Sequence, residues 1–438
     1  MVAVTTNIIR HLVLSIFLFW VLVYALVPAN GAPDVTLLLT YLAGLLSFSY
    51  LLAQMGRSGI VSHKLSLIAI LVFSFRVLVG VIHYLMFIDG AYFEQLVPHY
   101  QYIWDFEWMI YNMSMLSQHW TDNGLFSLPD TFVVQEQKNI LLMPYLALTY
   151  YLGGNEHFLN VAVVNSLHNV FVTALVASYA SGIASKKVVS AVFLIALLQP
   201  FGLFSSIMWR DSVGQLFLLT GAVMVFQYRS GLTDMFKALA GILLIGALRN
   251  LYILVGFSAL FVQMLSIGQR NSQVFIRFLM IIMLPAMVYF YIYDWVFSFY
   301  DLSSSRFAYG DESGDFLKRI IIGLVGPFPW TQIFDSGIPG REYMLADILQ
   351  AMFNLTVLYL FALGVLNTRI PWSKQPYITI IFLVGAIIGL GIFSYGHVSY
   401  VTVATVLLLP LIPDIRVVRF ASVFTTLFAV NFVVGSVW

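Results

Sequence analysis

The sequence predicts an all-α, polytopic membrane protein that forms a single integral membrane domain over residues 1–438. Three observations predict this class: 61% of the residues are hydrophobic, only 9% are charged, and the mean hydropathy is +0.91. A soluble domain usually carries about 25% charged residues, so most of this surface must face lipid. The net charge of +1 gives no reason to expect a nucleic-acid partner, and the absence of cysteine excludes disulfides and thiolate chemistry.

Apolar runs that could cross a bilayer as helices recur along the whole chain. A span needs about 20 apolar residues, and we predict about thirteen spans. The first run is preferred as a retained helix over a cleaved signal peptide, because a second span follows at once. Two short spans would also fit half-helices or tilted elements. The predicted spans are 9–28, 35–54, 65–88, 157–183, 188–208, 211–228, 236–249 (short), 251–268, 274–296, 344–367, 376–396, 398–412 (short) and 419–437.

Lysine and arginine predict which ends of these spans face the cytoplasm. With the N-terminus inside, the inner turns hold thirteen basic residues but only two acids, Asp234 and Asp414, while Arg76 stays within the membrane. We therefore expect a protein of the bacterial inner membrane with a cytoplasmic N-terminus and its large loops outside. The inner basic residues are Arg10, Arg57, Lys64, Lys186, Lys187, Arg229, Lys237, Arg270, Arg277, Arg369, Lys374, Arg416 and Arg419.

Two large loops, near 89–156 and 297–343, are predicted on the outer face. The apolar run 140–152 is not counted as a span, because a crossing there would invert every later turn. Since it contains Pro144, we interpret it as an interfacial or re-entrant helix. Loops of this length usually carry function.

The first outer loop contains the two candidate catalytic carboxylates, Asp105 and Glu107. They alternate with aromatic residues, where desolvation raises the pKa of a carboxyl group and suits it to general-base catalysis. Residues two apart on a helix point about 200° from each other, so one site would use only one of them, and Asp105 is preferred. The alternative is that both lie on the solvated face of an amphipathic interfacial helix.

Arginines at the outer ends of two spans are candidates for binding phosphate. Arg210, which is followed by Asp211, and Arg249 both stand at this level. Arginine can hold a phosphate through two N–H donors and keeps its charge. Bracing of two helices by Arg210 and Asp211 is the alternative. Arg76, in the middle of the third span, is costly to bury and is expected to face a cavity or a carboxylate; bracing and phosphate binding are both open for it.

Other polar residues are accessory candidates. Arg306 lies in the second outer loop, and His397 lies in the last outer turn, where a purely structural role is the alternative. His168, Asn165 and Asn169 form a polar stripe on the fourth span that is expected to hydrogen-bond between helices. No nucleotide-binding loop or zinc-protease motif occurs. No metal ligands are assigned and no organic cofactor is expected, while participation of a divalent cation stays open.

The order of these features resembles the GT-C superfamily of polyprenyl-phosphate-dependent glycosyltransferases, and also the multispan bacterial polymerases of O-antigen and exopolysaccharide repeat units. The resembling stretch, 89–268, contains Trp104-Asp-Phe-Glu107, Pro144, Trp209-Arg-Asp211 and Arg249. The resemblance implies that Asp105 or Glu107 activates an acceptor hydroxyl, while Arg210 and Arg249 neutralise the lipid phosphate. Asp-Phe-Glu replaces the adjacent acidic pair that is common in the superfamily.

We therefore expect an enzyme that transfers or polymerises glycan units from a polyprenyl (di)phosphate carrier at the non-cytoplasmic face. Its partners would be the lipid-linked sugar, membrane lipid and envelope-assembly proteins. The main alternative is a lipid-linked oligosaccharide flippase or another multispan transporter, which would favour internal repeats and short loops. A third is a non-catalytic envelope component that docks through its aromatic outer loops.

Overall fold

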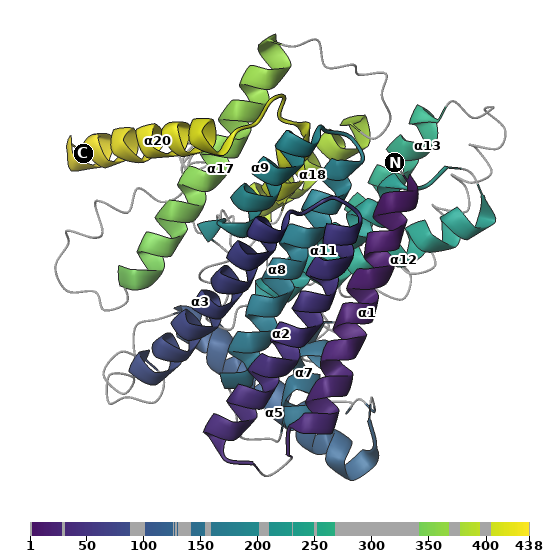
Figure 1. Ribbon diagram of the computed structural model, residues 1–438, viewed down its shortest axis with the longest axis vertical. Helices are drawn as coiled ribbons and strands as arrows, with labels where there is room; N and C mark the ends of the chain where they lie inside the picture. The colour runs from purple at the N-terminus through teal and green to yellow at the C-terminus, as the bar shows by residue number, and fades with distance from the viewer. Residues whose placement is uncertain are drawn as a thin grey trace, which may run out of the picture.

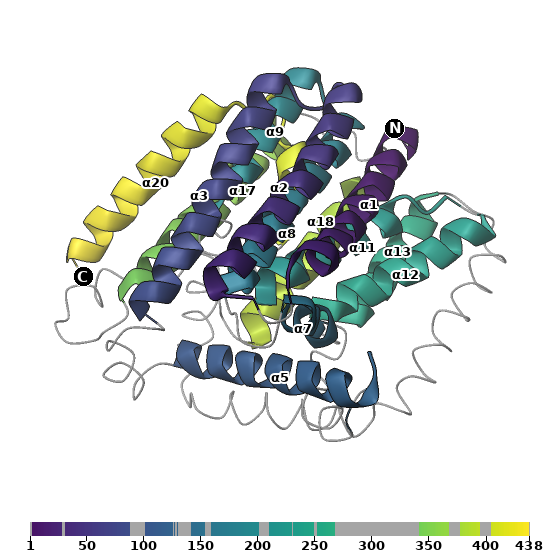
Figure 2. The same cartoon turned by 60° about the horizontal axis from the view of Figure 1, so that its bottom comes forward.

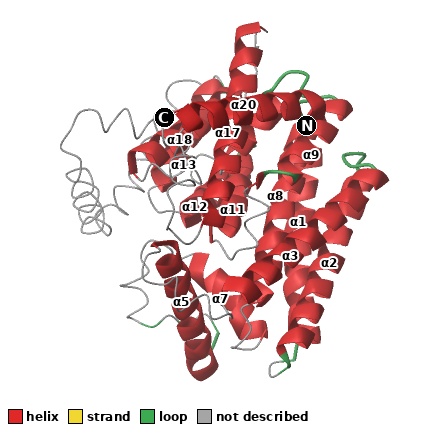
Figure 3. Ribbon diagram, turned by 90° about the vertical axis from the view of Figure 1, so that its left-hand side faces the viewer, coloured by secondary structure: helices red, strands yellow, loops and turns green. Residues whose placement is uncertain are grey.

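The computed structural model is all-α: thirteen α-helices and one 3-10 helix make up its regular structure over the described residues (Figures 1 and 3). The prediction of an all-α chain is confirmed. The structure describes residues 2–28, 31–87, 101–125, 127, 129, 142–153, 159–200, 210–229, 231–248, 252–267, 341–367, 377–394 and 404–437. The elements are α1 (Val2–Leu26), α2 (Pro33–Arg57), α3 (His63–Phe87), α5 (Gln101–Asn123), α7 (Leu142–Gly153), α8 (Leu159–Ser181), α9 (Lys186–Leu197), α11 (Arg210–Phe226), α12 (Leu232–Leu248), α13 (Tyr252–Ser266), α17 (Arg341–Asn367), α18 (Tyr377–Ser394), η2 (Val406–Leu411) and α20 (Val417–Val437).

Five of the described helices are long and apolar enough to cross a membrane. These five helices are α1, α2, α3, α8 and α17. Shorter apolar segments occur in α11, α13, α18 and α20. The outer helices expose large apolar side chains, among them Phe17, Leu38 and Leu71, whereas polar side chains are buried within the bundle. Because this is the reverse of a soluble protein, the described part has the character of a polytopic integral membrane protein.

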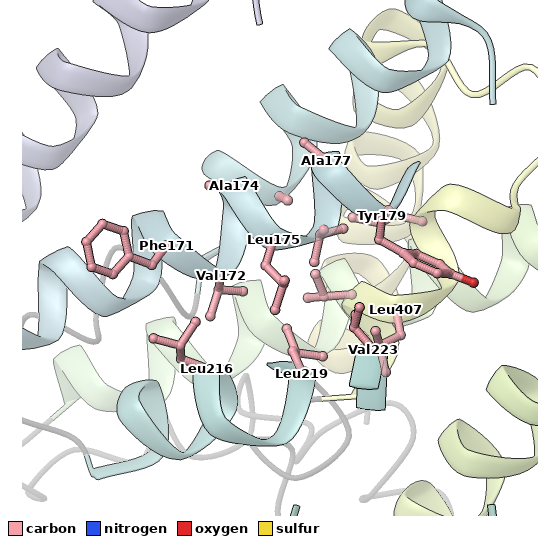
Figure 4. Packing of buried hydrophobic residues seen from close by; sticks show 14 of the residues in the cluster. Phe171, Val172, Ala174, Leu175, Ala177, Tyr179, Leu216, Leu219, Val223 and Leu407 are labelled. Atoms are coloured by element: carbon pink, nitrogen blue, oxygen red, sulfur yellow. The ribbon is translucent and has the colours of Figure 1, made fainter. Parts of the chain in front are cut away.

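Helix α8 is the centre of the bundle and is buried along almost its whole length. It packs against α1, α2 and α3 on one side and against α9, α11 and η2 on the other. Figure 4 shows Val172 and Leu175 of α8 beside Leu216 and Leu219 of α11, with Leu407 of η2 near Tyr179. Since Val172 pairs with Leu216 and Leu175 with Leu219, α8 and α11 run in the same direction.

Helices α11, α12 and α13 form two consecutive antiparallel hairpins. Glycines allow the first pair to approach closely: a Cβ on Gly241 would lie 2.7 Å from the carbonyl oxygen of Gly221, and a Cβ on Gly221 would collide with the carbonyl of Gly241. Small residues at such a crossing are typical of membrane helices, which gain stability from backbone packing. Because α12 runs antiparallel to α11, it ends, at Leu248, at the same end of the bundle at which α11 begins.

Exposed basic residues gather at one end of the bundle. The turns that join α2 to α3 and α8 to α9 lie side by side, since a Cβ on Gly59 would lie 3.9 Å from Lys186 Nζ. The N-terminus of the chain is at this end, while α5 and α7 lie at the opposite end (Figures 1 and 2). The exposed basic residues of the described turns that were predicted to be cytoplasmic are Arg57, Lys64, Lys186, Lys187, Arg229, Lys237, Arg416 and Arg419.

Two predicted spans differ from the structure. The span at 188–208 is interrupted, because α9 ends at Leu197 and the next residues form a turn before Pro200. Pro200 has no N–H to donate to the carbonyl of Ala196, so the helix cannot continue regularly through it. The described part of 398–412 is mainly the short helix η2, which contains Pro410 and is buried rather than spanning. The predicted span 274–296 lies outside the described residues.

Candidate functional site

The candidate site is built at the end of the bundle that carries α5 and α7. Helix α5 crosses this end at a large angle to α2 and α3 (Figure 2) and packs on α7. Its buried residues Met113, Leu116 and Trp120 follow helical spacing and join an apolar cluster with α7, Val161 of α8 and Val213 of α11. This cluster, which we call the end cluster, fixes α5 against α7, which in turn packs on α8 and α11.

Helix α7 is too short to cross a membrane, and the described part of α5 is buried along one face. Helix α7 has only 12 residues, which span about 18 Å at 1.5 Å per residue, too little for a hydrocarbon core of about 30 Å. At the exposed end of α5, Asp122 and Asn123 face solvent, while Trp120 Nε1 donates to the carbonyl oxygen of Ser127 at 2.8 Å. One face of α5 is thus buried and its end is polar, as an amphipathic helix requires.

The candidate carboxylates and the first arginine stand on α5 and α11, which both pack on α7 at this end. Asp105 and Glu107 lie in the first two turns of α5, and Arg210 and Asp211 begin α11. Val213, one turn after Arg210, belongs to the end cluster together with Met113 of α5. The four charged side chains themselves lie outside the described part of the chain, as do Arg249, Arg306 and His397 entirely.

The packing of α11 on α8 shows where Arg210, the first residue of α11, lies along the length of α8. Leu216 lies beside Val172 in Figure 4, and the two helices run in the same direction. Arg210 precedes Leu216 by six residues, which corresponds to Ser166 on α8. The first turn of α11 therefore begins at the level of the polar stripe of α8, which contains Asn165 and Asn169.

Arg76 of α3 is fully buried at the level of this stripe. Its Nη1 donates to Asn169 Oδ1 at 3.0 Å, and its Nη2 donates to the carbonyl oxygen of Leu197. Gln199 Nε2 donates to the same Asn169 oxygen at 3.3 Å. Arg76 thus joins α3, α8 and the end of α9. Of the two expected surroundings, a cavity or a carboxylate, the described residues show no carboxylate paired with it; its partners there are an amide oxygen and a backbone carbonyl.

The interruption of α9 explains why an arginine is placed there. Leu197 is the last residue of α9, so its carbonyl lacks the N–H that a continuing helix would supply. The C-terminus of a helix also carries a partial negative charge. The Arg76 guanidinium satisfies the carbonyl and complements this charge, which offsets part of the cost of burying a cation.

A second buried network joins α1, α7 and α8. His168 Nδ1 lies 2.6 Å from the carbonyl oxygen of Val164, which can only accept, so Nδ1 carries the proton. Nε2 then accepts from the Tyr145 hydroxyl at 2.5 Å. Trp20 Nε1 donates to the same hydroxyl oxygen at 3.4 Å. The expected hydrogen bonding between helices through His168 and Asn169 is confirmed.

Several of these residues were not identified from the sequence. Gln199 stands in a run that was assigned to a continuous span, although the following Pro200 was a signal of a break. Tyr145 and Trp20 are aromatic residues in apolar helices, and nothing in the sequence distinguishes them from the many others. Their polar roles depend on which residues face them across helix contacts.

The comparisons with known proteins give no assignment. No family model matches the chain, and neither curated proteins nor solved structures include a significant match to it.

Proposed function

We propose that the protein is a membrane glycosyltransferase or glycan polymerase that uses a polyprenyl (di)phosphate-linked sugar at the non-cytoplasmic face. One observation carries the proposal: through the end cluster, α7 joins α5, the helix of Asp105 and Glu107, to α11, which begins at Arg210. A candidate base and a candidate phosphate-binding residue thus stand on helices that both pack on α7 at one end of the bundle. The other end carries the exposed basic turns.

The proposal includes an orientation in the bacterial inner membrane. Exposed lysine and arginine at the end opposite to α5 support a cytoplasmic N-terminus. The α5–α7 end then faces outward, with α5 and α7 at the interface. About thirteen spans, some interrupted as α9 is, complete the proposed topology.

In the proposed reaction, an acceptor hydroxyl attacks the anomeric carbon of the lipid-linked sugar. Asp105, or Glu107 in its place, takes the hydroxyl proton as the new C–O bond forms. The bond between the anomeric carbon and the phosphate oxygen breaks, and the lipid phosphate leaves with the electron pair. Arg210 and Arg249 would neutralise that leaving group, with Arg76 as a third cation at nearly the same level.

Supporting evidence for Arg249 comes from the hairpin geometry. Helix α12 ends at Leu248, one residue before Arg249, and α12 returns to the end at which α11 begins. Asp211, Arg306 and His397 are accessory candidates in this proposal. The substrate partners are the lipid-linked sugar and membrane lipid, with envelope-assembly proteins as further partners.

The test is isosteric substitution of the carboxylates, assayed as transfer from a lipid-linked glycan in isolated membranes. Asp105→Asn or Glu107→Gln should lower the rate by about 10²–10⁴-fold, because proton transfer by a positioned base contributes that much. Asp122→Asn is the matched control, since Asp122 is an exposed acid on the same helix. Wild-type rates in both Asp105→Asn and Glu107→Gln, with protein present at wild-type level, would contradict the mechanism.

A transporter or flippase is the second candidate, and one observation favours it. Helix α9 is interrupted and buried Arg76 lies at its end, and interrupted helices with charged residues line substrate sites in many transporters. Reconstitution into liposomes separates the two candidates. Movement of a lipid-linked glycan between leaflets without covalent transfer would favour the transporter, whereas a new glycosidic bond would favour the enzyme.

A further inference from the structure

Three buried polar side chains meet at the interruption of α9, and each has an atom without a partner. Arg76, Asn169 and Gln199 are all fully buried. They are joined through Asn169 Oδ1, which accepts from Arg76 Nη1 at 3.0 Å and from Gln199 Nε2 at 3.3 Å. The atoms that remain unpaired are Arg76 Nε, Asn169 Nδ2 and Gln199 Oε1. We call these three residues the α9-break cluster.

The unpaired atoms have a definite chemical character. Arg76 Nε and Asn169 Nδ2 are N–H donors, and Gln199 Oε1 is an acceptor. A buried polar atom without a hydrogen bond loses its hydration with nothing in return, so three in one cluster are an unfavourable arrangement unless something binds there. The complement of the cluster is a group that offers both acceptors and a hydroxyl.

The charge of the cluster points to an anion. The described partners of Arg76 are an amide oxygen and a backbone carbonyl, and neither carries a full negative charge. The end of α9 supplies only a partial charge of about half an electron. A cation that keeps its proton in proteins is therefore buried in the middle of a membrane bundle without a full counter-charge.

We propose that the α9-break cluster binds a protonated phosphate group, either free phosphate or the headgroup of a phosphorylated lipid. Arg76 Nε and Asn169 Nδ2 would donate to phosphate oxygens, and Gln199 Oε1 would accept from the phosphate hydroxyl. Arginine suits such a ligand because its planar N–H groups match the spacing of phosphate oxygens. For a lipid headgroup, this inference deepens and rests on the proposed function, which already places Arg76 among the cations for the leaving phosphate; the arm with free phosphate tests the site without it.

The test measures binding rather than turnover, on the full chain purified in nanodiscs. Thermal unfolding is followed by tryptophan fluorescence during titration with sodium phosphate at constant ionic strength. In a second arm the nanodiscs contain a polyprenyl monophosphate, with the uncharged polyprenol as its control. A saturable rise in Tm of several degrees is expected in at least one arm, because a ligand that binds only the folded state stabilises it. A rise with phosphate alone identifies free phosphate, and a rise with the lipid alone identifies a headgroup.

Gln199→Glu is the decisive variant. The new carboxylate would supply the missing counter-charge beside Arg76 and repel an anion, so the Tm without ligand should be maintained or rise while the affinity for the effective probe falls at least tenfold. Gln54→Glu is the matched control, since it makes the same change at a half-buried position near the end of α2; it should keep the wild-type response. If Gln199→Glu does not fold, Gln199→Met, which removes the acceptor without adding charge, should also weaken binding.

Two results would overturn the proposal. One is the absence of a saturable response to both probes in the wild-type protein. The other is a wild-type response in a folded Gln199 variant. Loss of binding without loss of glycan transfer, or the reverse, separates this inference from the proposed function, because the carboxylate variants of α5 leave the α9-break cluster unchanged.

Discussion

The guanidinium of Arg76 on α3 donates a hydrogen bond to the carbonyl oxygen of Leu197, the last residue of α9. This contact joins a buried arginine to the end of an interrupted helix. An interrupted helix exposes carbonyls that need donors, and a buried arginine needs acceptors. Each therefore lowers the cost of the other, and together they fix the middle of α3 and the end of α9 against α8.

Replacement of Arg76 should destabilise the fold. Arg76→Met removes the donor to Leu197, and we expect the free energy of unfolding to fall by about 1–3 kcal/mol for the orphaned carbonyl. Arg76→Lys should restore part of this loss, because lysine keeps the charge and one donor group. Chemical denaturation in detergent measures the effect. Arg57→Met, at an exposed position, should change stability by less than about 0.5 kcal/mol; equal losses at both sites would refute the bracing role.

Removal of the Tyr145 hydroxyl should also cost stability. Tyr145→Phe leaves His168 Nε2 and Trp20 Nε1 without their described partner, and we expect a loss of about 1–3 kcal/mol. A double-mutant cycle with His168→Ala should give a coupling energy of about 0.5–3 kcal/mol, as residues in one network do. Tyr24→Phe serves as the control, because Tyr24 is 75% exposed on the same helix as Trp20. Additive losses for Tyr145 and His168 would argue against the network.

Replacing a glycine by alanine should change stability differently at the crossing of α11 and α12 and at an open position on α18. Gly221→Ala should destabilise by about 1–3 kcal/mol, because the new methyl group forces the helices apart. Gly385→Ala on α18 should be neutral or stabilising by up to about 1 kcal/mol, since nothing lies within 4 Å of its Cβ and alanine favours a helix. Melting temperatures of the two variants test this. A similar change at both glycines would mean that the close approach does not matter.

The sequence predicted the class and the separation of the two ends well, because both depend on local composition. Apolar runs such as those of α2 and α8 appear as helices close to their predicted bounds. Basic turns around Arg57 and Lys186 lie together at one end, as the charge pattern indicated. Helix α7, which was excluded from the spans on topological grounds, is short.

The interruption of α9 was missed because hydropathy does not sense backbone hydrogen bonds. Residues 188–208 are apolar enough to cross, and Pro200 alone signals the break. The partners of Arg76 were not predictable either, since Asn169 and Leu197 reach it from two other helices. The catalytic assignments to Asp105, Glu107, Arg210 and Arg249 stay predictions that rest on sequence and on the helices that carry them.

In the proposed topology, the α5–α7 end of the bundle faces outward and the basic turns face the cytoplasm. The chain has no cysteine, so single cysteines can be introduced without a background. Asp122→Cys on α5 and Ser58→Cys in the turn after α2 replace exposed residues at opposite ends. A membrane-impermeant maleimide should label position 122 in intact cells and position 58 only after permeabilisation; labelling of position 58 in intact cells, with position 122 protected, would contradict the account.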